Sequence, residues 1–281
     1  MQIIEPQQSD KYAQYIRVLG WQVVRMDDVN IFYRQFPLFG GMMKIHRPLK
    51  LPIPKKLVSI IKNNHIKTLV IEPVETQNQK QLDAWCRTLA KSVKINTTPF
   101  LPTKTFRVDL TRDENTIFGS FSEAKRRAVR RAIKLGVTVK KSEQITDLIR
   151  IKNRSGGLFG FITTTGIKEL WNIFHPKNIS ILLAYAPGDD DHPVGGVLLL
   201  FWDKIAYYWI AGAIKKGKRL YAPTLLVWEA LKESKERKCR LFDFVGVWDE
   251  RIPDKNTEWK GFTKFKEGFG GTDMYYPLVV H

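Results

Sequence analysis

Cysteine and paired histidines are scarce in this 281-residue chain, and their scarcity removes several kinds of site. Cys86 and Cys239 are far apart and show no CxxC spacing, so neither a disulfide framework nor a zinc site is predicted. The five histidines form no HxH or HxxxH pair, which argues against a histidine-ligated metal. Two buried, unreactive thiols are the expected outcome.

Long apolar runs are missing as well. The longest, around Val194–Trp202, has about ten residues, roughly half of what a membrane-spanning helix needs. The first ten residues lack the charged and apolar segments of a signal peptide. We therefore expect a soluble, cytoplasmic protein, and a peripheral contact with the inner face of the cytoplasmic membrane is left open.

Acidic residues are few relative to basic ones. The chain has 46 Lys and Arg against 28 Asp and Glu, a net charge of +18, and a hydrophobic share of 43% that suffices for a full core. Such an excess of positive charge favours a polyanionic partner: nucleic acid, anionic lipid headgroups or a phosphorylated substrate. A basic surface that only maintains solubility is the alternative.

The order of strand and helix patterns predicts an α/β protein with mixed sheets. Strand and helix signals alternate up to the proline-broken segment Thr97–Pro102, where we place a domain boundary. The second half reads helix, three-strand meander, helix, strand, helix, strand. The predicted domains are 1–103 and 104–271, followed by residues 272–281.

A basic helix is the strongest charge feature. Ser122 is a good N-cap, and an apolar stripe from Ala124 to Leu135 is expected to pack on the domain. Arginine side chains suit phosphate oxygens, so the other surfaces of this helix are candidates for holding nucleic acid. The candidate residues are Lys125, Arg126, Arg127, Arg130, Arg131 and Lys134. A second basic stretch, Lys215–Arg219, is read as a loop before a helix that can hold a phosphate.

The segment Phe262–Gly271 combines two lysines, three phenylalanines and three glycines. Glycine allows close approach of a ligand to the backbone, and a lysine among phenylalanines is a focused positive charge where negative charge develops in a reaction. The alternative is a helix end in which Gly268 is the C-cap and the phenylalanines belong to the core. Both interpretations stay open at this point.

With these residues the chain resembles the FemABX peptidyltransferases, whose fold is similar to two acetyltransferase-type (GNAT) domains in tandem. The resemblance begins near Ile66 and is loose before it, and the coiled-coil arm inserted in some members is absent. The matching segments are Val108–Thr111, Lys125–Val137, Tyr207–Ala213, Tyr221–Pro223 with Trp228, Phe242–Val247 and Phe265–Gly271.

The resemblance implies a function. Such enzymes transfer an amino acid from aminoacyl-tRNA to an amine on the peptide of a lipid- or nucleotide-linked peptidoglycan precursor, forming interpeptide bridges without a metal or an organic cofactor. By similarity, Lys266 and Phe265 are the catalytic residues, and Lys266 stabilises the oxyanion or the departing ribose oxygen. The family's C-terminal strand often returns to the first domain, so residues 272–281 are expected to complete that domain. Tyr208, Tyr221, Asp243 and Gly246 line the acceptor channel, and the basic helix holds the tRNA acceptor stem.

Two departures from the family pattern concern the acceptor. Where some members have a lysine for the precursor's phosphates, near Tyr12–Arg17, this chain has Gln14, with Lys11 and Arg17 as substitutes. Where they have an arginine after the turn at Phe161–Thr165, this chain has threonines. The acceptor is therefore expected to differ from the usual muropeptide.

Two other functions fit the same features. An acyl-CoA-dependent N-acyltransferase would use the same fold, but the usual [QR]xxGx[GA] loop is incomplete at Lys215–Ala222, where Gly217 is present. A non-catalytic protein that binds RNA or an anionic surface would need the basic helix alone. Strong stabilisation by acetyl-CoA would favour the acyl-CoA-dependent enzyme. Loss of Lys266 should lower turnover in an aminoacyltransferase and leave a non-catalytic binding protein intact.

Overall fold

The chain divides into two compact units, each built on its own sheet. The computed structural model describes residues 3–155 and 164–279. Unit 1 comprises residues 3–104 together with 274–279, and unit 2 comprises residues 105–273 apart from the segment 156–163. Among the described residues, no helix has both the length and the apolar character needed to cross a bilayer.

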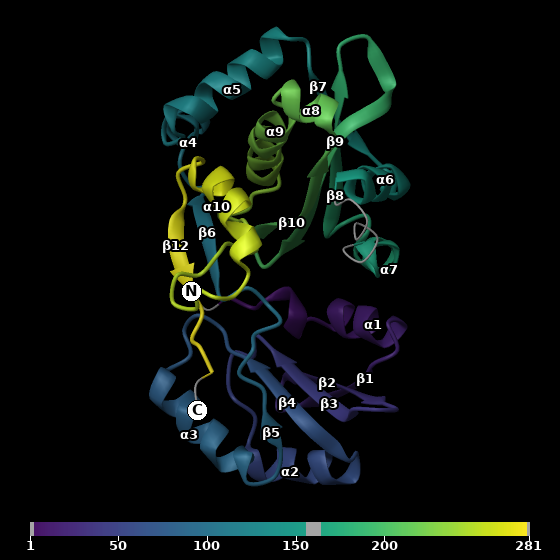
Figure 1. The fold of residues 1–281 in the computed structure, drawn as a ribbon, viewed down its shortest axis with the longest axis vertical. Coiled ribbons are helices and arrows are strands. Elements are labelled where there is room, and N and C mark those ends of the chain that lie inside the picture. The colour runs from purple at the N-terminus through teal and green to yellow at the C-terminus, as the bar shows by residue number, and fades with distance from the viewer. Residues whose placement is uncertain (1–2, 156–163, 280–281) are drawn as a thin grey trace. The chain divides into compact units, whose positions relative to one another are not determined.

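Unit 1 contains a five-stranded mixed sheet in the order β1-β2-β3-β4-β5 (Figure 1). The pairs β1–β2 and β2–β3 are antiparallel, whereas β3–β4 and β4–β5 are parallel. Parallel neighbours need crossover connections, which helices α2 and α3 supply. The strands are Gln22–Met26 (β1), Val29–Phe36 (β2), Gly40–His46 (β3), Ile66–Glu72 (β4) and Lys94–Ile95 (β5).

Helices cover both faces of this sheet because successive residues of a strand point to opposite sides. Ile31 of β2 belongs to the core cluster that α2 and α3 complete. Its neighbour Phe32 instead contacts Tyr12 of α1, with ring centroids 6.0 Å apart. The helices are the 3-10 turn Pro6–Gln8 (η1), Asp10–Val18 (α1), Pro54–Asn63 (α2) and Gln79–Ala90 (α3).

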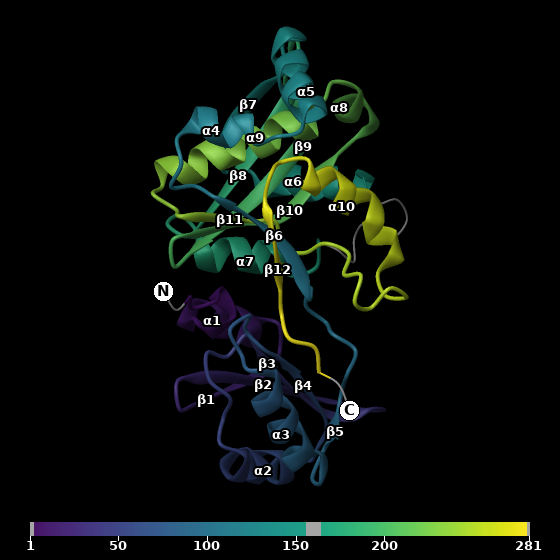
Figure 2. The ribbon, with the colours of Figure 1, turned by 90° about the vertical axis from the view of Figure 1, so that its left-hand side faces the viewer.

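Unit 2 contains a seven-stranded mixed sheet in the order β12-β6-β11-β10-β9-β8-β7. The pair β10–β11 is parallel, and the pairs β6–β11, β10–β9, β9–β8 and β8–β7 are antiparallel. Figure 2 shows the last strand, β12, beside β6. The strands are Lys104–Asp109 (β6), Thr138–Ser142 (β7), Ile179–Ala186 (β8), Asp189–Trp202 (β9), Ile205–Ala213 (β10), Leu241–Asp243 (β11) and Thr272–Tyr275 (β12).

Two neighbouring glycines of β9 show how the helices of unit 2 divide between the faces. A side chain at Gly195 would meet Leu226 of α9, and one at Gly196 would meet Leu148 of α6. Helix α9 therefore covers one face of β8–β10 and α6 the other (Figure 1). The helices are Glu114–Gly119 (α4), Glu123–Lys134 (α5), Ile145–Ser155 (α6), Ile167–Phe174 (α7), Lys215–Arg219 (α8), Ala222–Glu236 (α9), the 3-10 turn Thr257–Trp259 (η3) and Lys260–Glu267 (α10).

The mixed α/β class predicted from the sequence is confirmed by the two mixed sheets. Helix α1 and strand β1, at residues 10–26, were not predicted from the sequence. The polar segment 188–193 has the composition of a turn, but β9 already begins at Asp189. The loop predicted at Lys215–Arg219 is the short helix α8. The predicted domain limits, 1–103 completed by 272–281 and 104–271, stay a prediction.

Candidate functional site

An open cleft of about 970 Å³ lies in unit 2 along one edge of β10. Its floor is the stretch Tyr208–Ala213 of β10. The walls come from segments far apart in the sequence: α5, α6, α8, the start of α9, and α10. The wall residues named below are Lys125, Lys152, Lys218, Tyr221, Phe262, Phe265 and Lys266.

The cleft exists because two parallel strands separate. Strand β11 pairs with β10 over Ile205–Tyr207 and then ends at Asp243, whereas β10 continues to Ala213. The chain leaves the sheet through Val245, at φ +60°, and Gly246, at φ +128°. The value at Gly246 suits glycine, and the value at a β-branched valine is costly, so this turn must be held in place by its surroundings. Beyond Tyr207, the edge of β10 therefore faces the cleft.

Lys266 holds that turn and also lines the cleft. Its Nζ donates hydrogen bonds to the carbonyl oxygens of Phe244, at 2.7 Å, and Gly246, at 2.6 Å. The same nitrogen lies 4.8 Å from the centre of the Phe262 ring. Burial lowers the pKa of Lys266 to about 7; the nearby Asp243 opposes this shift and Lys152 adds to it. An ammonium group has three donors, so one remains after the two carbonyls are satisfied.

Asp243 stands behind Lys266, outside the residues that line the cleft. Its carboxylate is buried and accepts hydrogen bonds from Arg107 Nε, Thr105 Oγ1 and the Val245 backbone N–H, each at 2.7 Å. Gly246 likewise takes part through its carbonyl rather than through the cleft wall. Both residues therefore position Lys266, and the direct contacts with an acceptor expected from the family stay a prediction.

Lys125 lies in the cleft, unlike the other basic residues of α5. Its Nζ is 3.8 Å from the centre of the Phe265 ring and 5.1 Å from that of Phe269, two cation–π contacts. Burial lowers the pKa of Lys125 to about 8. Phe265, which was predicted to act with Lys266, thus contacts Lys125, whereas the ring that Lys266 contacts is that of Phe262. The sequence assigned Lys125 to the surface of the helix, because the bend that brings α10 alongside α5 is a tertiary feature.

Lysines dominate the charge of the cleft. Lys125, Lys152, Lys218 and Lys266 all line it, and none of the described lining residues is acidic. Burial lowers the pKa of Lys152 too. Sequence analysis missed Lys152, which follows an ordinary amphipathic pattern in α6, and grouped Lys218 with a basic loop. Concentrated positive charge with apolar walls suits a ligand that carries negative charge.

Two tyrosines, Tyr208 and Tyr221, line the cleft. Tyr208 is buried against Phe242 and Phe244, and burial raises the pKa of its hydroxyl. Tyr221 has φ +59° just before α9, where it turns the chain so that the helix begins beside the cleft. The side chain of Arg131 lies 5.4 Å from the Tyr221 ring. This contact links the rim of the cleft to the outer surface of α5.

The outer surface of α5 is basic but carries fewer available cations than predicted. Arg126 donates to the carbonyls of Gly119 and Phe121, and so closes the preceding turn. Arg127 pairs with Glu123 at 3.3 Å, with both side chains exposed. Arg130, Arg131 and Lys134 are exposed. The expected apolar stripe is narrower than predicted: Val129 and Ala132 are buried, whereas Ile133 and Leu135 are exposed.

The glycines of Phe262–Gly271 approach other protein segments, which corrects the expectation that they approach a ligand. A side chain at Gly268 would meet the Lys125 side chain at 2.7 Å, and one at Gly270 would meet the Ser120 carbonyl oxygen at 2.5 Å. Gly268 is the C-cap of α10, and Phe269 is fully buried. The glycines therefore belong to a helix end and its packing, whereas Phe262, Phe265 and Lys266 line the cleft.

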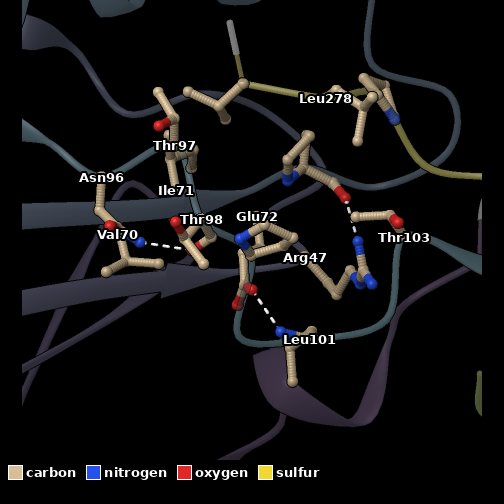
Figure 3. Close-up of a pocket in the computed structure, with 14 residues that line it drawn as sticks. Arg47, Val70, Ile71, Glu72, Asn96, Thr97, Thr98, Leu101, Thr103 and Leu278 are labelled. Atoms are coloured by element: carbon tan, nitrogen blue, oxygen red, sulfur yellow. Dashed lines mark hydrogen bonds between the residues drawn. The ribbon is translucent and has the colours of Figure 1, made fainter. Parts of the chain in front are cut away.

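A second cavity, in unit 1, is too small for a substrate (Figure 3). Its volume is about 20 Å³, room for a single water molecule. Glu72 accepts the backbone N–H of Phe100 at 2.6 Å. Glu72 also accepts the backbone N–H of Leu101, and Arg47 donates to the Pro73 carbonyl at 2.7 Å (Figure 3). These bonds anchor the segment that leaves unit 1. Among residues 3–155 and 164–279, no three His, Cys, Asp or Glu side chains gather to hold a metal ion.

The predicted substitutes for the family's phosphate-binding lysine, Lys11 and Arg17, both lie on α1 with Gln14. The first three residues of the Phe161–Thr165 turn lie outside the described residues.

Comparison with known proteins gives a family match over part of the chain and a similar fold. Residues 182–276 match the FemAB family model. FemX has a similar structure, with a TM-score of 0.77 and 16% identity over 98% of this chain and 91% of its own. The C-terminal domain of a putative lysylphosphatidylglycerol synthetase from Agrobacterium fabrum follows, with a TM-score of 0.61 and 15% identity over 96% of this chain and 87% of its own. No curated protein sequence matches significantly.

The GNAT-like character of the fold is also confirmed. A tandem GNAT protein from the clavulanic acid biosynthesis pathway has a TM-score of 0.53 and 10% identity over 90% of this chain and 80% of its own. At such identities the structural likeness concerns the fold, and the sequence match to the FemAB family model covers residues 182–276. The FemAB match over residues 182–276 and the FemX-like fold of two mixed sheets both agree with the resemblance to the FemABX family.

Proposed function

We propose that this protein is an aminoacyltransferase that moves an amino acid from aminoacyl-tRNA to an amine of a peptidoglycan precursor peptide. The observation that carries the proposal is the position of Lys266 on the wall of a cleft whose described lining residues include no Asp or Glu. Its Nζ is held by two carbonyl oxygens, and the third N–H of the ammonium group is available to a substrate. The FemAB match over residues 182–276 supports the reaction class.

The chemistry asks little of the protein beyond positioning and charge. The acceptor amine attacks the carbonyl carbon of the aminoacyl ester, and a C–N bond forms. The tetrahedral intermediate then loses the ribose oxygen as the C–O bond breaks, and the amine's proton ends on that oxygen. The remaining N–H of Lys266 donates to the oxyanion, a contribution typically worth about 3–4 kcal/mol of barrier. In its protonated form Lys125, beside Phe265, adds positive charge near the adjoining phosphate of the tRNA end.

The acceptor is the finer part of the proposal. A lipid- or nucleotide-linked muropeptide is the acceptor that the family suggests. The structural likeness to a putative lysylphosphatidylglycerol synthetase adds a second class, the headgroup of an anionic lipid. Charged tRNA pools carrying labelled amino acids, incubated with muropeptide precursors or with phosphatidylglycerol, separate the two. Label in neither acceptor, with intact charged tRNA, would contradict the proposal.

The outer surface of α5 is proposed to hold the tRNA acceptor stem. The double variant Arg130→Glu/Arg131→Glu is expected to weaken tRNA binding about ten- to a hundredfold and to make the salt dependence of log Kd less steep by about one to two units, because fewer phosphates are neutralised. Fluorescence anisotropy across a salt series measures both quantities. The variant Lys168→Glu/Lys177→Glu, with the same charge change at exposed lysines outside α5, is the control. Equal loss in both variants would mean that net charge alone binds tRNA.

The lowered pKa of Lys266 predicts a pH effect on the chemical step. Its amine is protonated below about pH 7 and loses its charge above, so its stabilisation of the oxyanion is present at low pH and lost as pH rises through about 7. The ratio of wild-type to Lys266→Met single-turnover rates is expected to fall across that range. The same ratio for Lys266→Arg, whose guanidinium stays charged, should be flat. A flat wild-type ratio would contradict the assignment.

An acyl-CoA-dependent N-acyltransferase is the second candidate, favoured by the likeness to a tandem GNAT protein. In this chain, however, Gly217 allows close packing on β9, since a side chain there would meet the Val194 carbonyl oxygen at 2.3 Å. A thermal-shift measurement with acetyl-CoA distinguishes the two candidates, because tight binding raises the melting temperature. Strong stabilisation would favour the CoA-dependent enzyme.

A further inference from the structure

The hairpin between β2 and β3 presents two large apolar side chains to solvent. Leu38 is 89% exposed and Phe39 is 80% exposed, more than any other large hydrophobic residue in the described chain. They follow Pro37, whose ring fixes the backbone, and the turn is closed by the bond from Phe39 N–H to Phe36 O at 3.3 Å. The fold buries neither side chain, so packing within unit 1 does not explain why Leu38 and Phe39 are apolar.

The base of this hairpin is well ordered and basic. Phe36 packs against Trp21 with ring centroids 5.9 Å apart, and the guanidinium of Arg34 lies 5.5 Å from the Phe36 ring. The aliphatic part of the Lys67 side chain lies beside Gly40, and a Cβ at position 40 would come within 2.7 Å of it. Arg34 and Lys67 are both exposed. The apolar tip is therefore bordered by cations on a firm support.

Acidic residues are kept away from this tip. Between Lys11 and Ile71 the sequence has eleven lysines and arginines and two acids, Asp27 and Asp28. Both acids lie in the turn between β1 and β2, at the opposite end of β2 from the tip, and Asp27 pairs with Lys56 at 2.8 Å. The surface around Leu38 and Phe39 is thus positive without a nearby carboxylate of this segment.

The shape of the tip argues for a lipid surface over a protein partner. Two protruding side chains bury far less than the roughly 800 Å² per partner of a stable protein interface. A bilayer accepts protruding apolar side chains without a matching cavity, and anionic headgroups attract the bordering cations. We propose that the β2–β3 hairpin docks unit 1 on an anionic membrane surface, with Leu38 and Phe39 entering the headgroup layer. This inference does not depend on the proposed aminoacyl transfer.

Sedimentation of the full-length protein with vesicles tests the proposal. Wild type is expected to bind phosphatidylglycerol/phosphatidylcholine vesicles, to bind pure phosphatidylcholine at least tenfold more weakly, and to be released by salt. The variant Leu38→Ser/Phe39→Ser should bind anionic vesicles at least tenfold more weakly. The control is Ile53→Ser. Ile53 lies in the same unit, is 51% exposed and is the N-cap of α2, and this variant should bind like wild type. Equal binding of the hairpin variant and wild type would overturn the proposal, as would no binding by wild type.

A spectroscopic probe reports contact of the tip itself. Because Cys86 and Cys239 are buried, a polarity-sensitive dye can be attached selectively at Phe39→Cys. Its emission should shift to the blue with anionic vesicles, and the same dye at Ile53→Cys should not shift. A shift at both positions would show general adsorption by charge and overturn the assignment to the hairpin. A change of oligomeric state in the serine variant, without a change in vesicle binding, would identify a second copy of the chain as the partner instead.

Discussion

Replacing Lys266 with methionine is expected to lower the turnover of aminoacyl transfer about a hundred- to a thousandfold. The reason is that a fixed donor aimed at the oxyanion acts mainly in the transition state, so its loss changes kcat more than binding of the charged tRNA. Methionine keeps the length and apolar stem of the side chain and removes the charge. Steady-state kinetics with saturating aminoacyl-tRNA measure the effect, and anisotropy measures tRNA affinity separately.

Lys264 offers a matched control in the same helix. It lies two residues away on α10, is exposed, and is not among the residues that line the cleft. Lys264→Met should therefore retain wild-type turnover within about twofold, as is usual for surface substitutions worth less than about 0.5 kcal/mol. A normal transfer rate in Lys266→Met, or an equal loss in both variants, would remove Lys266 from the proposed mechanism.

Replacing Arg107 with methionine is expected to destabilise unit 2 by about 3–5 kcal/mol. Arg107 and Asp243 are both buried, and their ion pair joins Nε to Oδ2 at 2.7 Å. Removing one partner leaves an uncompensated carboxylate in the interior, which costs far more than the pair itself contributes. The melting temperature should fall by roughly 10 °C for a unit of this size. The turn that holds Lys266 depends on the same carboxylate, so activity should fall as well.

Two further variants separate the pair from general loss of charge. Lys140→Met breaks the exposed pair with Asp190, at 2.9 Å, and should cost less than about 1 kcal/mol. The double variant Arg107→Met/Asp243→Leu removes both buried charges and should recover much of the stability lost in Arg107→Met. No recovery in the double variant, measured by chemical denaturation, would mean that packing and not charge explains the effect.

Several features of the fold follow from local sequence. The cap at Ser122, which accepts from the Lys125 backbone N–H, begins α5 where the sequence predicts it. Strand β8, with every residue buried, and helix α2, with a proline in its first turn, are also where their patterns place them. These elements depend on capping, side-chain period and proline geometry, all of which act within a few residues along the chain.

The resemblance singled out Lys266 within its segment, and the catalytic role of Lys266 stays a prediction. The sequence by itself could not assign the glycines around this residue. Whether Gly268 admits a ligand or a neighbouring helix depends on what packs there, and the structure places Lys125 in that space. A glycine allows another group to approach the backbone closely, but the sequence does not show which segment of the chain does so.

Only the tertiary structure decided which cations meet. Lys125, Lys152, Lys218 and Lys266 come from four helices and converge because β10 and β11 separate after Tyr207. Composition shows an excess of positive charge but not its place, since charge is a property of each residue, whereas a field is the sum over residues brought together by the fold. For the same reason two residues of one helix differ: Lys125 lines the cleft, whereas Arg130 is exposed to solvent.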